Sequence, residues 1–293
     1  MEIFYVNAFT TRPFQGNPAS VCIPSPEFAG TLTDTQLQSL AAELCMVEVV
    51  YIFPKENSQD GADYHLRFFS QKQEMTFCGH ATLAAAFVLF QTRRATSKIV
   101  SFSTQKNNAV VCTKCSEDTT DLEMELTPIP PRVNNTLLDS VAPLLVEGLG
   151  LRKENVADVI LHSETMNLIF VLRTRADVEA AVLQSSKLMH LAPKDVHKVT
   201  ITAPGADASH NFVTRLFAPW IGIPEDAVSA ATNAILALYW AEEQRTRSLV
   251  VLQLSQRPGR IVLNVSADRK KVGVIGDAVI VTKGMLSCSI QRL

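Results

Sequence analysis

The stretch FCGHATLAAAFVLF, from Phe77 to Phe90, predicts the fold more clearly than any other part of the sequence. From Ala81 to Phe90 only Thr82 is polar, so a helix here has no solvated face. We therefore expect this helix to run through the middle of a domain that surrounds it. Its start carries Cys78, Gly79 and His80, where free backbone N–H groups and the helix dipole favour an anion. A buried helix with titratable groups at its start is a candidate active site.

Length and charge set limits on the class of protein. The chain has 293 residues, enough for two medium domains that each bury a core. A net charge of -2 argues against nucleic-acid or anionic-membrane partners. No apolar run has the length of a membrane span, and the N-terminus lacks a secretory signal pattern. We expect a cytoplasmic protein; the ending Gln291-Arg292-Leu293, which shares part of a peroxisome-type address, leaves that compartment as an alternative.

The six cysteines are too few and too scattered for a disulfide scaffold. Cys112 and Cys115 have the spacing of a redox or zinc pair, but no second Cys or His pair accompanies them. Phosphate-binding loops, dinucleotide fingerprints and metal-ligand patterns are also missing from the sequence. The sequence therefore predicts a site without a cofactor or a metal.

A proline-rich stretch, Thr127 to Pro131, follows a strand-like segment and marks a predicted domain boundary. The predicted domains are residues 1–131 and 132–293, with the last strand, Ala278 to Thr282, free to cross back to the first domain. The remaining strand-like runs are short and alternate in polarity, which is typical of antiparallel sheets in the α+β class.

The two halves of the sequence resemble each other. Arg67-Phe68-Phe69 leads by a short loop to the apolar helix of the first half, and Arg215-Leu216-Phe217 leads similarly to a second mostly apolar helix, Ser229 to Glu243. This pattern predicts two copies of one α+β unit. A pseudo-two-fold relation would bring both helix starts to one interdomain cleft, a usual place for a small anionic ligand.

Four residues could carry chemistry, and each also has a structural alternative. Glu48 precedes a buried strand and is either a general base with a raised pKa or half of an ion pair. His80 is a proton relay or a hydrogen-bonded structural group. Cys78 is a helix-start thiolate of lowered pKa or a small buried hydrophobe. Asp226 orients a ligand or caps the second helix.

Together the motifs make the chain resemble phenazine-biosynthesis (PhzF-like) proteins of the diaminopimelate-epimerase fold. The residues that carry the resemblance are Phe14 to Ala19, Glu48, Leu66 to Phe69, Cys78 to Ala86, Arg215 to Asp226 and Tyr239-Trp240. The resemblance implies two pseudo-symmetric domains, each a curled antiparallel sheet wrapped around a central apolar helix, in a homodimer.

The same resemblance implies cofactor-independent isomerase or epimerase chemistry on a small anionic, carboxylate-bearing metabolite. By matching positions it assigns catalysis to Glu48, His80 and Asp226. It assigns substrate binding to the residues at Asn17, Cys78, Gly79, Ala230 and Ala231.

The sequence departs from the family pattern after Asp226. Where the family has Pro-x-Thr-Gly-Ser, this chain has Ala227, Val228, Ser229, Ala230 and Ala231. A lost serine hydroxyl removes one donor to a bound anion, worth about 1 to 3 kcal/mol when its partner stays buried. A catalytically impaired member that binds a metabolite or a protein is therefore the alternative function.

Overall fold

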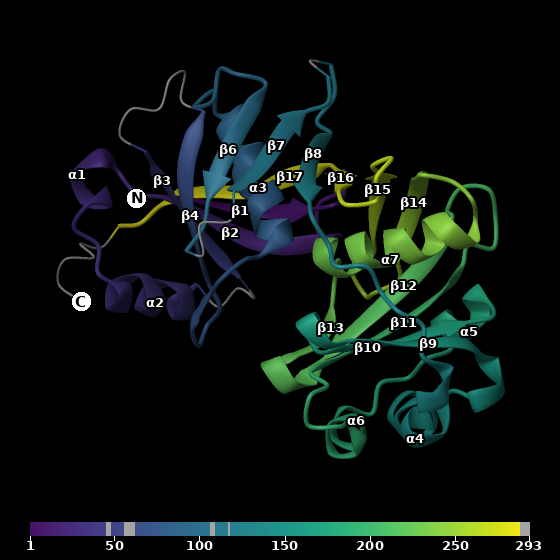
Figure 1. Cartoon of the computed structure of the whole chain (residues 1–293). Coiled ribbons are helices and arrows are strands. Elements are labelled where there is room, and N and C mark those ends of the chain that lie inside the picture. Colours follow the sequence, from purple (N-terminus) through teal and green to yellow (C-terminus); the bar gives the residue numbers. More distant parts are fainter. Residues whose placement is uncertain (45–47, 56–61, 106–108, 117, 288–293) are drawn as a thin grey trace. The chain divides into compact units, whose positions relative to one another are not determined.

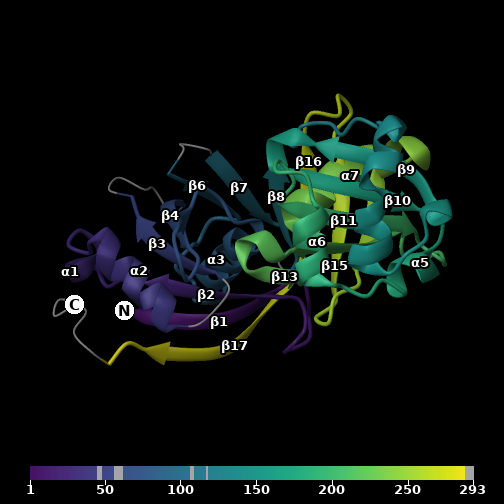
Figure 2. The ribbon, with the colours of Figure 1, turned by 90° about the horizontal axis from the view of Figure 1, so that it is seen from below.

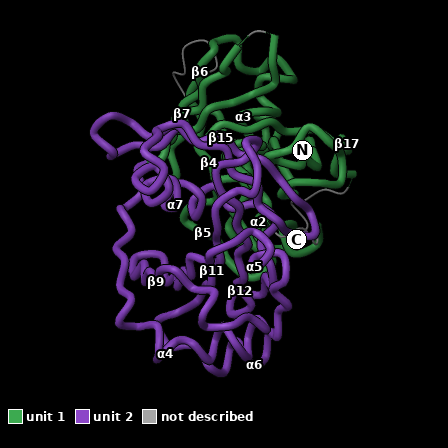
Figure 3. Tube along the Cα trace, turned by 90° about the vertical axis from the view of Figure 1, so that its right-hand side faces the viewer, with its two compact units in different colours: residues 1–126, 274–293 green, residues 127–273 purple. Residues whose placement is uncertain are grey.

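The computed structural model describes residues 1–44, 48–55, 62–105, 109–116 and 118–287. The chain folds into two compact units, shown in separate colours in Figure 3. Unit 1 is residues 1–126 with 274–293, and unit 2 is residues 127–273. Unit 1 leaves off at Leu126, where β8 (Leu122–Leu126) ends, so the proline-rich stretch 127–131 belongs to unit 2. The predicted alternative address at Gln291 to Leu293 lies outside the described residues.

Unit 1 is built around one apolar helix, α3, which contacts strands from both ends of its sheet (Figure 1). Every α3 residue from His80 to Leu89 is buried, as the all-apolar pattern requires. The helices and strands of unit 1 are β1 (Glu2–Ala8), β2 (Asn17–Ile23), α1 (Pro26–Ala29), α2 (Asp34–Glu43), β3 (Val49–Pro54), β4 (Asp63–Phe69), β5 (Glu74–Met75), α3 (Gly79–Gln91), β6 (Ile99–Ser103), β7 (Ala109–Lys114), β8 (Leu122–Leu126) and β17 (Ala278–Met285).

The last strand returns to the first. β17 pairs antiparallel with β1, whose other edge pairs antiparallel with β2, and Figure 2 shows the three strands side by side. The β1–β2 turn depends on Gly16, which has φ +66°. A Cβ there would lie 2.2 Å from the carbonyl oxygen of Ala8, so no other residue fits without a shift of the backbone. Gly16 thereby fixes where Asn17 enters the sheet.

Unit 2 repeats this plan around a second helix, α7, of which the stretch from Thr232 to Leu238 is buried. Its elements are α4 (Leu138–Pro143), β9 (Val156–His162), β10 (Asn167–Leu172), α5 (Arg175–Glu179), α6 (Ser185–Leu191), β11 (Lys198–Pro204), β12 (Phe212–Ala218), β13 (Ile223–Asp226), α7 (Ala230–Glu243), β14 (Ser248–Gln253) and β15 (Gly259–Val265), with β16 (Val272–Gly276) running across the boundary into unit 1.

The strand pairings show that the units are repeats. In unit 1, β2–β3 is parallel, β3–β4 antiparallel and β4–β6 parallel; in unit 2, β10–β11 is parallel, β11–β12 antiparallel and β12–β14 parallel. Arg67 lies opposite Tyr51, and Arg215 lies opposite Ile201 at the corresponding place. The duplication suggested by the two arginine motifs is therefore present in the fold.

The expectation of purely antiparallel sheets is wrong in one respect. Each unit has a mixed sheet, because α3 and α7 are crossover helices that return the chain to the same end of the sheet before the next strand. The strands β6, β7 and β8 do form the predicted antiparallel meander. None of the helices in the described part of the chain combines the length and hydropathy needed to cross a membrane.

Two helices in the second half of the chain differ from those predicted from the sequence. The predicted helix from Val141 to Leu149 is interrupted, because α4 ends at Pro143 and continues as a π-helical turn, Leu144–Gly148. The predicted helix from Ala176 to Leu183 ends early, with α5 finishing at Glu179. Both segments nevertheless supply residues to one apolar core, which includes Leu144, Leu145 and Val178.

Candidate active site

Glu48 lies immediately before β3 and is only 7% exposed. Its backbone oxygen accepts a hydrogen bond from the Ser20 N–H at 3.1 Å, which fixes the start of β3 against β2. A carboxylate buried in this way is costly unless it is paired. The position of Glu48 is thus set by the sheet, and its burial calls for a nearby partner.

That partner is His80, in the first turn of α3. His80 Nε2 lies 3.2 Å from Glu48 Oε2, and both side chains are less than 10% exposed. The two atoms are close enough for an ion pair, although Glu48 Oε2 has no other partner among the described residues. Glu48 is thus held beside His80 as a buried carboxylate–imidazole pair.

Cys78 is the N-cap residue of α3 and completes the cluster. Its Sγ lies 3.5 Å from His80 Nδ1 and 3.8 Å from Nε2. The Cys78 side chain does not cap the helix, which leaves the sulfur turned to the imidazole. We name Glu48, Cys78 and His80 the α3-start cluster.

Burial and charge set the protonation of this cluster. Burial by itself would lower the pKa of His80, but the neighbouring Cys78 sulfur and the Glu48 carboxylate outweigh it and hold this pKa well above the ordinary value. Burial raises the pKa of the Cys78 thiol. The thiolate alternative for Cys78 is therefore not favoured: desolvation outweighs the helix-start position.

The structure also places the other predicted site residues of unit 1. Gly79 is the first residue of α3, so its backbone N–H is among those that a helix leaves unpaired. Asn17 begins β2 and is 2% exposed. Cys112 is buried within β7 while Cys115 is exposed, and neither joins a potential metal-binding group among the described residues.

In unit 2 the start of α7 carries Asp226, Ala230 and Ala231. Asp226 ends β13 and does not cap α7, because Ser229 is the N-cap and its Oγ accepts from the Thr232 N–H at 3.3 Å. Ala230 is 2% exposed, whereas Ala231 is exposed. The capping alternative for Asp226 is thus excluded, and its role as an orienting group stays a prediction.

Sequence reasoning missed Gln253, the residue that organises this second helix start. Gln253 Oε1 accepts from the Ser229 N–H and from Asn233 Nδ2, both at 2.9 Å, and its Nε2 donates to the Asp226 carbonyl at 2.8 Å. It is 1% exposed at the end of β14. A polar residue at a buried position of an alternating strand was the available signal.

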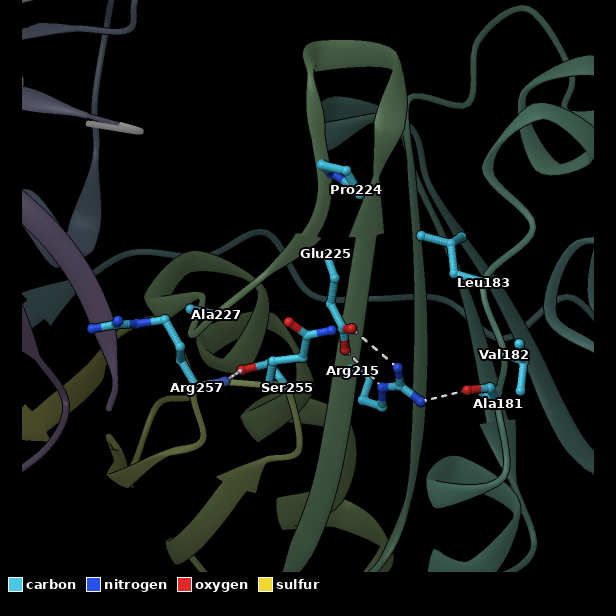
Figure 4. A pocket seen from close by; sticks show the side chains of 10 residues that line it. Ala181, Val182, Leu183, Arg215, Pro224, Glu225, Ala227, Ser255 and Arg257 are labelled. Atoms are coloured by element: carbon cyan, nitrogen blue, oxygen red, sulfur yellow. Dashed lines mark hydrogen bonds and ion pairs between the residues drawn. The ribbon is translucent and has the colours of Figure 1, made fainter. Parts of the chain in front are cut away.

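A cavity of about 650 Å³ lies in unit 2 beside this helix start (Figure 4). Arg215 and Glu225 form one wall as a doubly hydrogen-bonded pair, with Arg215 Nη1 also donating to the Ala181 carbonyl at 2.7 Å. Arg257 lines another side, and burial lowers its pKa. The charge of Arg215 in this wall is matched by that of Glu225.

Comparison with known proteins identifies the family of this chain. The family model described as phenazine biosynthesis-like protein matches residues 6–284, nearly the whole chain. The chain belongs to the phenazine biosynthesis-like, or PhzF-like, family. A mouse relative, phenazine biosynthesis-like domain-containing protein 2, is 29% identical, with 98% of this chain and 99% of the relative covered.

Two further matches bear on chemistry and fold. A Pseudomonas aeruginosa protein named as an uncharacterized isomerase is 30% identical, with 98% of both chains covered. A crystal structure of a PhzF family protein from Enterococcus faecalis superimposes with a TM-score of 0.81 at 28% identity, covering 97% of each chain. The diaminopimelate-epimerase-like α+β fold expected from the sequence is therefore correct.

Proposed function

We propose that this PhzF-like protein is a cofactor-independent isomerase or epimerase. It removes a proton from carbon in a small carboxylate-bearing metabolite, and Glu48 is the base. The observation that supports this most directly is the buried Glu48 Oε2, which has no hydrogen bond with the described residues and lies 3.2 Å from His80 Nε2. The isomerase name of the Pseudomonas aeruginosa relative agrees with it.

The cluster can complete a balanced proton cycle. The Glu48 carboxylate takes the proton from the substrate C–H bond, and the electron pair of that bond delocalises into the adjacent unsaturated group. His80, as imidazolium, returns a proton to another carbon of the substrate. Glu48 is then protonated and His80 neutral, so transfer of one proton across their 3.2 Å contact restores both. No external acid or base is consumed.

The developing negative charge needs stabilisation as well as a base. The unpaired amides in the first turn of α3, near Gly79, and the positive end of the helix dipole suit a substrate carboxylate or an enolate-like oxygen. The proposal also assigns Asp226 and the backbone at Ala230 and Ala231 to orienting the substrate. Asn17 and Cys78 are assigned to binding it.

Hydrogen exchange in heavy water tests the proposal whatever the product is. The purified protein is incubated in D2O with a panel of small carboxylic acids, and deuterium incorporation is followed by mass spectrometry. We expect one panel member to gain deuterium at carbon, and Glu48→Gln to slow this exchange by about 10²- to 10⁴-fold. Equally fast exchange by Glu48→Gln would remove Glu48 from the role of base.

A binding protein without catalysis is the second candidate, favoured by the alanines at 230 and 231. The Ser229 hydroxyl already accepts from the Thr232 N–H at 3.3 Å, and position 231 holds an alanine, which has no hydroxyl to donate to a ligand. This function predicts metabolite binding with no exchange and little effect of Glu48→Gln on affinity. The double variant Ala230→Gly/Ala231→Ser is the matched test: unchanged affinity and turnover would show that the two alanines are not the cause.

A further inference from the structure

The α3-start cluster has a second chemical capacity. One sulfur, one imidazole nitrogen and one carboxylate oxygen, from Cys78, His80 and Glu48, lie within 4.8 Å of one another, and all three residues are buried. Within the described part of the chain, no other His, Cys, Asp and Glu side chains meet in this way. Thiolate, imidazole and carboxylate are the three ligand types that proteins use for Zn²⁺.

The distances agree with a single ion. Zinc bonds of about 2.3 Å to sulfur and about 2.0 to 2.2 Å to nitrogen and oxygen place tetrahedral ligand atoms about 3.3 to 3.6 Å apart. Cys78 Sγ lies 3.8 Å from His80 Nε2, and His80 Nε2 lies 3.2 Å from Glu48 Oε2. These two separations differ from the tetrahedral spacing by a few tenths of an ångström, and Cys78 Sγ and Glu48 Oε2 lie within 4.8 Å of each other, so the three atoms surround one position and leave a fourth ligand position open.

Two features of the protein support such a site independently of these distances. Glu48 Oε2 is a buried acceptor that has no hydrogen bond with the described residues, so a bound cation would satisfy it. The three ligands are also held by regular structure: the Glu48 carbonyl accepts from the Ser20 N–H of β2 at 3.1 Å, and Cys78 and His80 lie within one turn at the start of α3.

We propose that Glu48, Cys78 and His80 bind one Zn²⁺ ion as a three-ligand site, and that the bound ion inhibits proton transfer. Cys78 binds as thiolate and His80 through neutral Nε2, so their protons pass to the buffer on binding. The ion occupies the lone pairs that Glu48 and His80 use in catalysis. Metal binding rests on geometry alone, whereas inhibition also rests on the proposed function.

Direct binding measurements test the site without substrate. Chelator-treated protein is titrated with Zn²⁺ in competition with a chromophoric zinc chelator, and with Co²⁺ to record sulfur-to-cobalt charge transfer. We expect one ion per chain and a sulfur-to-cobalt band. Cys78→Ser should abolish the band, and Cys78→Ser and His80→Asn should each weaken Zn²⁺ affinity by at least about 100-fold. Circular dichroism establishes that each variant is folded.

The matched control is Cys112→Ser/Cys115→Ser, which removes the pair with zinc-like spacing and should bind Zn²⁺ as the parent does. Equal affinity in Cys78→Ser, or loss of binding in the control, would overturn the site. If heavy-water exchange is detected, stoichiometric Zn²⁺ should suppress it and chelator should restore it; binding without suppression would overturn the inhibitory role. Absence of exchange in every protein would count against the proposed function while leaving the binding result intact.

Discussion

The starts of α3 and α7 share a backbone plan and differ in the side chains around them. In unit 1, Thr82 Oγ1 donates to the carbonyl of the N-cap residue Cys78 at 2.8 Å; in unit 2, Asn233 Nδ2 donates to the carbonyl of the N-cap residue Ser229 at 2.9 Å. Both bonds run from the fourth residue after the N-cap, so the repeated units treat the helix entry alike.

The difference lies in how polar groups are satisfied. Around α7, Ser229 caps the helix and Gln253 joins the loop, the helix and β14 by three hydrogen bonds. Around α3, Cys78 does not cap and a buried oxygen of Glu48 has no hydrogen bond with the described residues. From this comparison we propose that Ser229 and Gln253 serve the stability of unit 2, whereas the α3-start cluster of unit 1 carries the proton transfer.

The largest loss of stability should come from removing a feature that both units share, the arginine–glutamate pair. Arg215 and Glu225 are 14% and 16% exposed, and Arg67 and Glu74 are 19% and 17% exposed. Replacing either arginine by methionine leaves a poorly solvated carboxylate, so Arg215→Met and Arg67→Met should each lower the free energy of unfolding by about 3 kcal/mol. Urea unfolding measures this loss.

The control for this prediction removes both partners. Arg215→Met/Glu225→Met should recover much of the stability, since no unpaired charge is left. A large loss in one unit and none in the other would contradict the equivalence of the two pairs.

A smaller loss should follow from Gln253→Ala, which acts on unit 2 alone. The change leaves the Ser229 N–H and the Asn233 amide without their acceptor and opens space at a position that is 1% exposed. We expect a loss of about 2 kcal/mol in the free energy of unfolding, again by urea titration. A loss below about 0.5 kcal/mol, the size of an ordinary surface substitution, would show that the network does not hold the α7 start together.

Ser229→Ala should cost about 1 kcal/mol, because it removes the N-cap hydroxyl of α7. Ser229→Asp keeps a capping oxygen and serves as the matched control, with stability close to the parent. Thermal unfolding followed by circular dichroism measures both variants. Equal losses in the two would mean that capping is not what Ser229 contributes.

The smallest expected signal is a change in the pH dependence of stability. Because the pKa of His80 is raised in the folded state, its contribution is complete below the unfolded value of about 6.5 and is lost as pH rises through the folded pKa. Stability of the parent relative to His80→Asn should thus decline above about pH 6.5. Denaturant titrations in chelator-containing buffer measure this difference, and a difference that grows with pH would contradict the charged assignment.

Particular residues show what the sequence could predict. The apolar run from Ala81 to Phe90 predicted a central helix because helical burial leaves a one-dimensional signal, and the two arginine motifs predicted the repeat. Glu48 could be identified because a charged residue directly before an apolar strand stands out in the sequence itself. The parallel pairs in each sheet went unpredicted, although crossover helices require them.

Two features of the site depend on contacts between residues distant in the sequence. Gln253 contacts the α7 start from β14, and no local pattern shows which buried amide a glutamine will meet. The state of Cys78 depends on how completely the surrounding chain buries it, so the helix-start position alone gave the wrong direction for its pKa. The local sequence pattern thus pointed to the candidate residues, whereas the pKa shifts of these residues could be worked out only from the folded structure.

The assignment of chemistry to unit 1 and stability to unit 2 is tested most directly by measuring heavy-water exchange in Glu48→Gln and Ser229→Ala side by side. Both rates are compared with the parent on the panel acid that exchanges. We predict that Glu48→Gln loses about 10²- to 10⁴-fold in exchange rate, while Ser229→Ala stays within about tenfold of the parent despite its lower stability. Rapid exchange by Glu48→Gln, or an equal loss in both variants, would contradict the account.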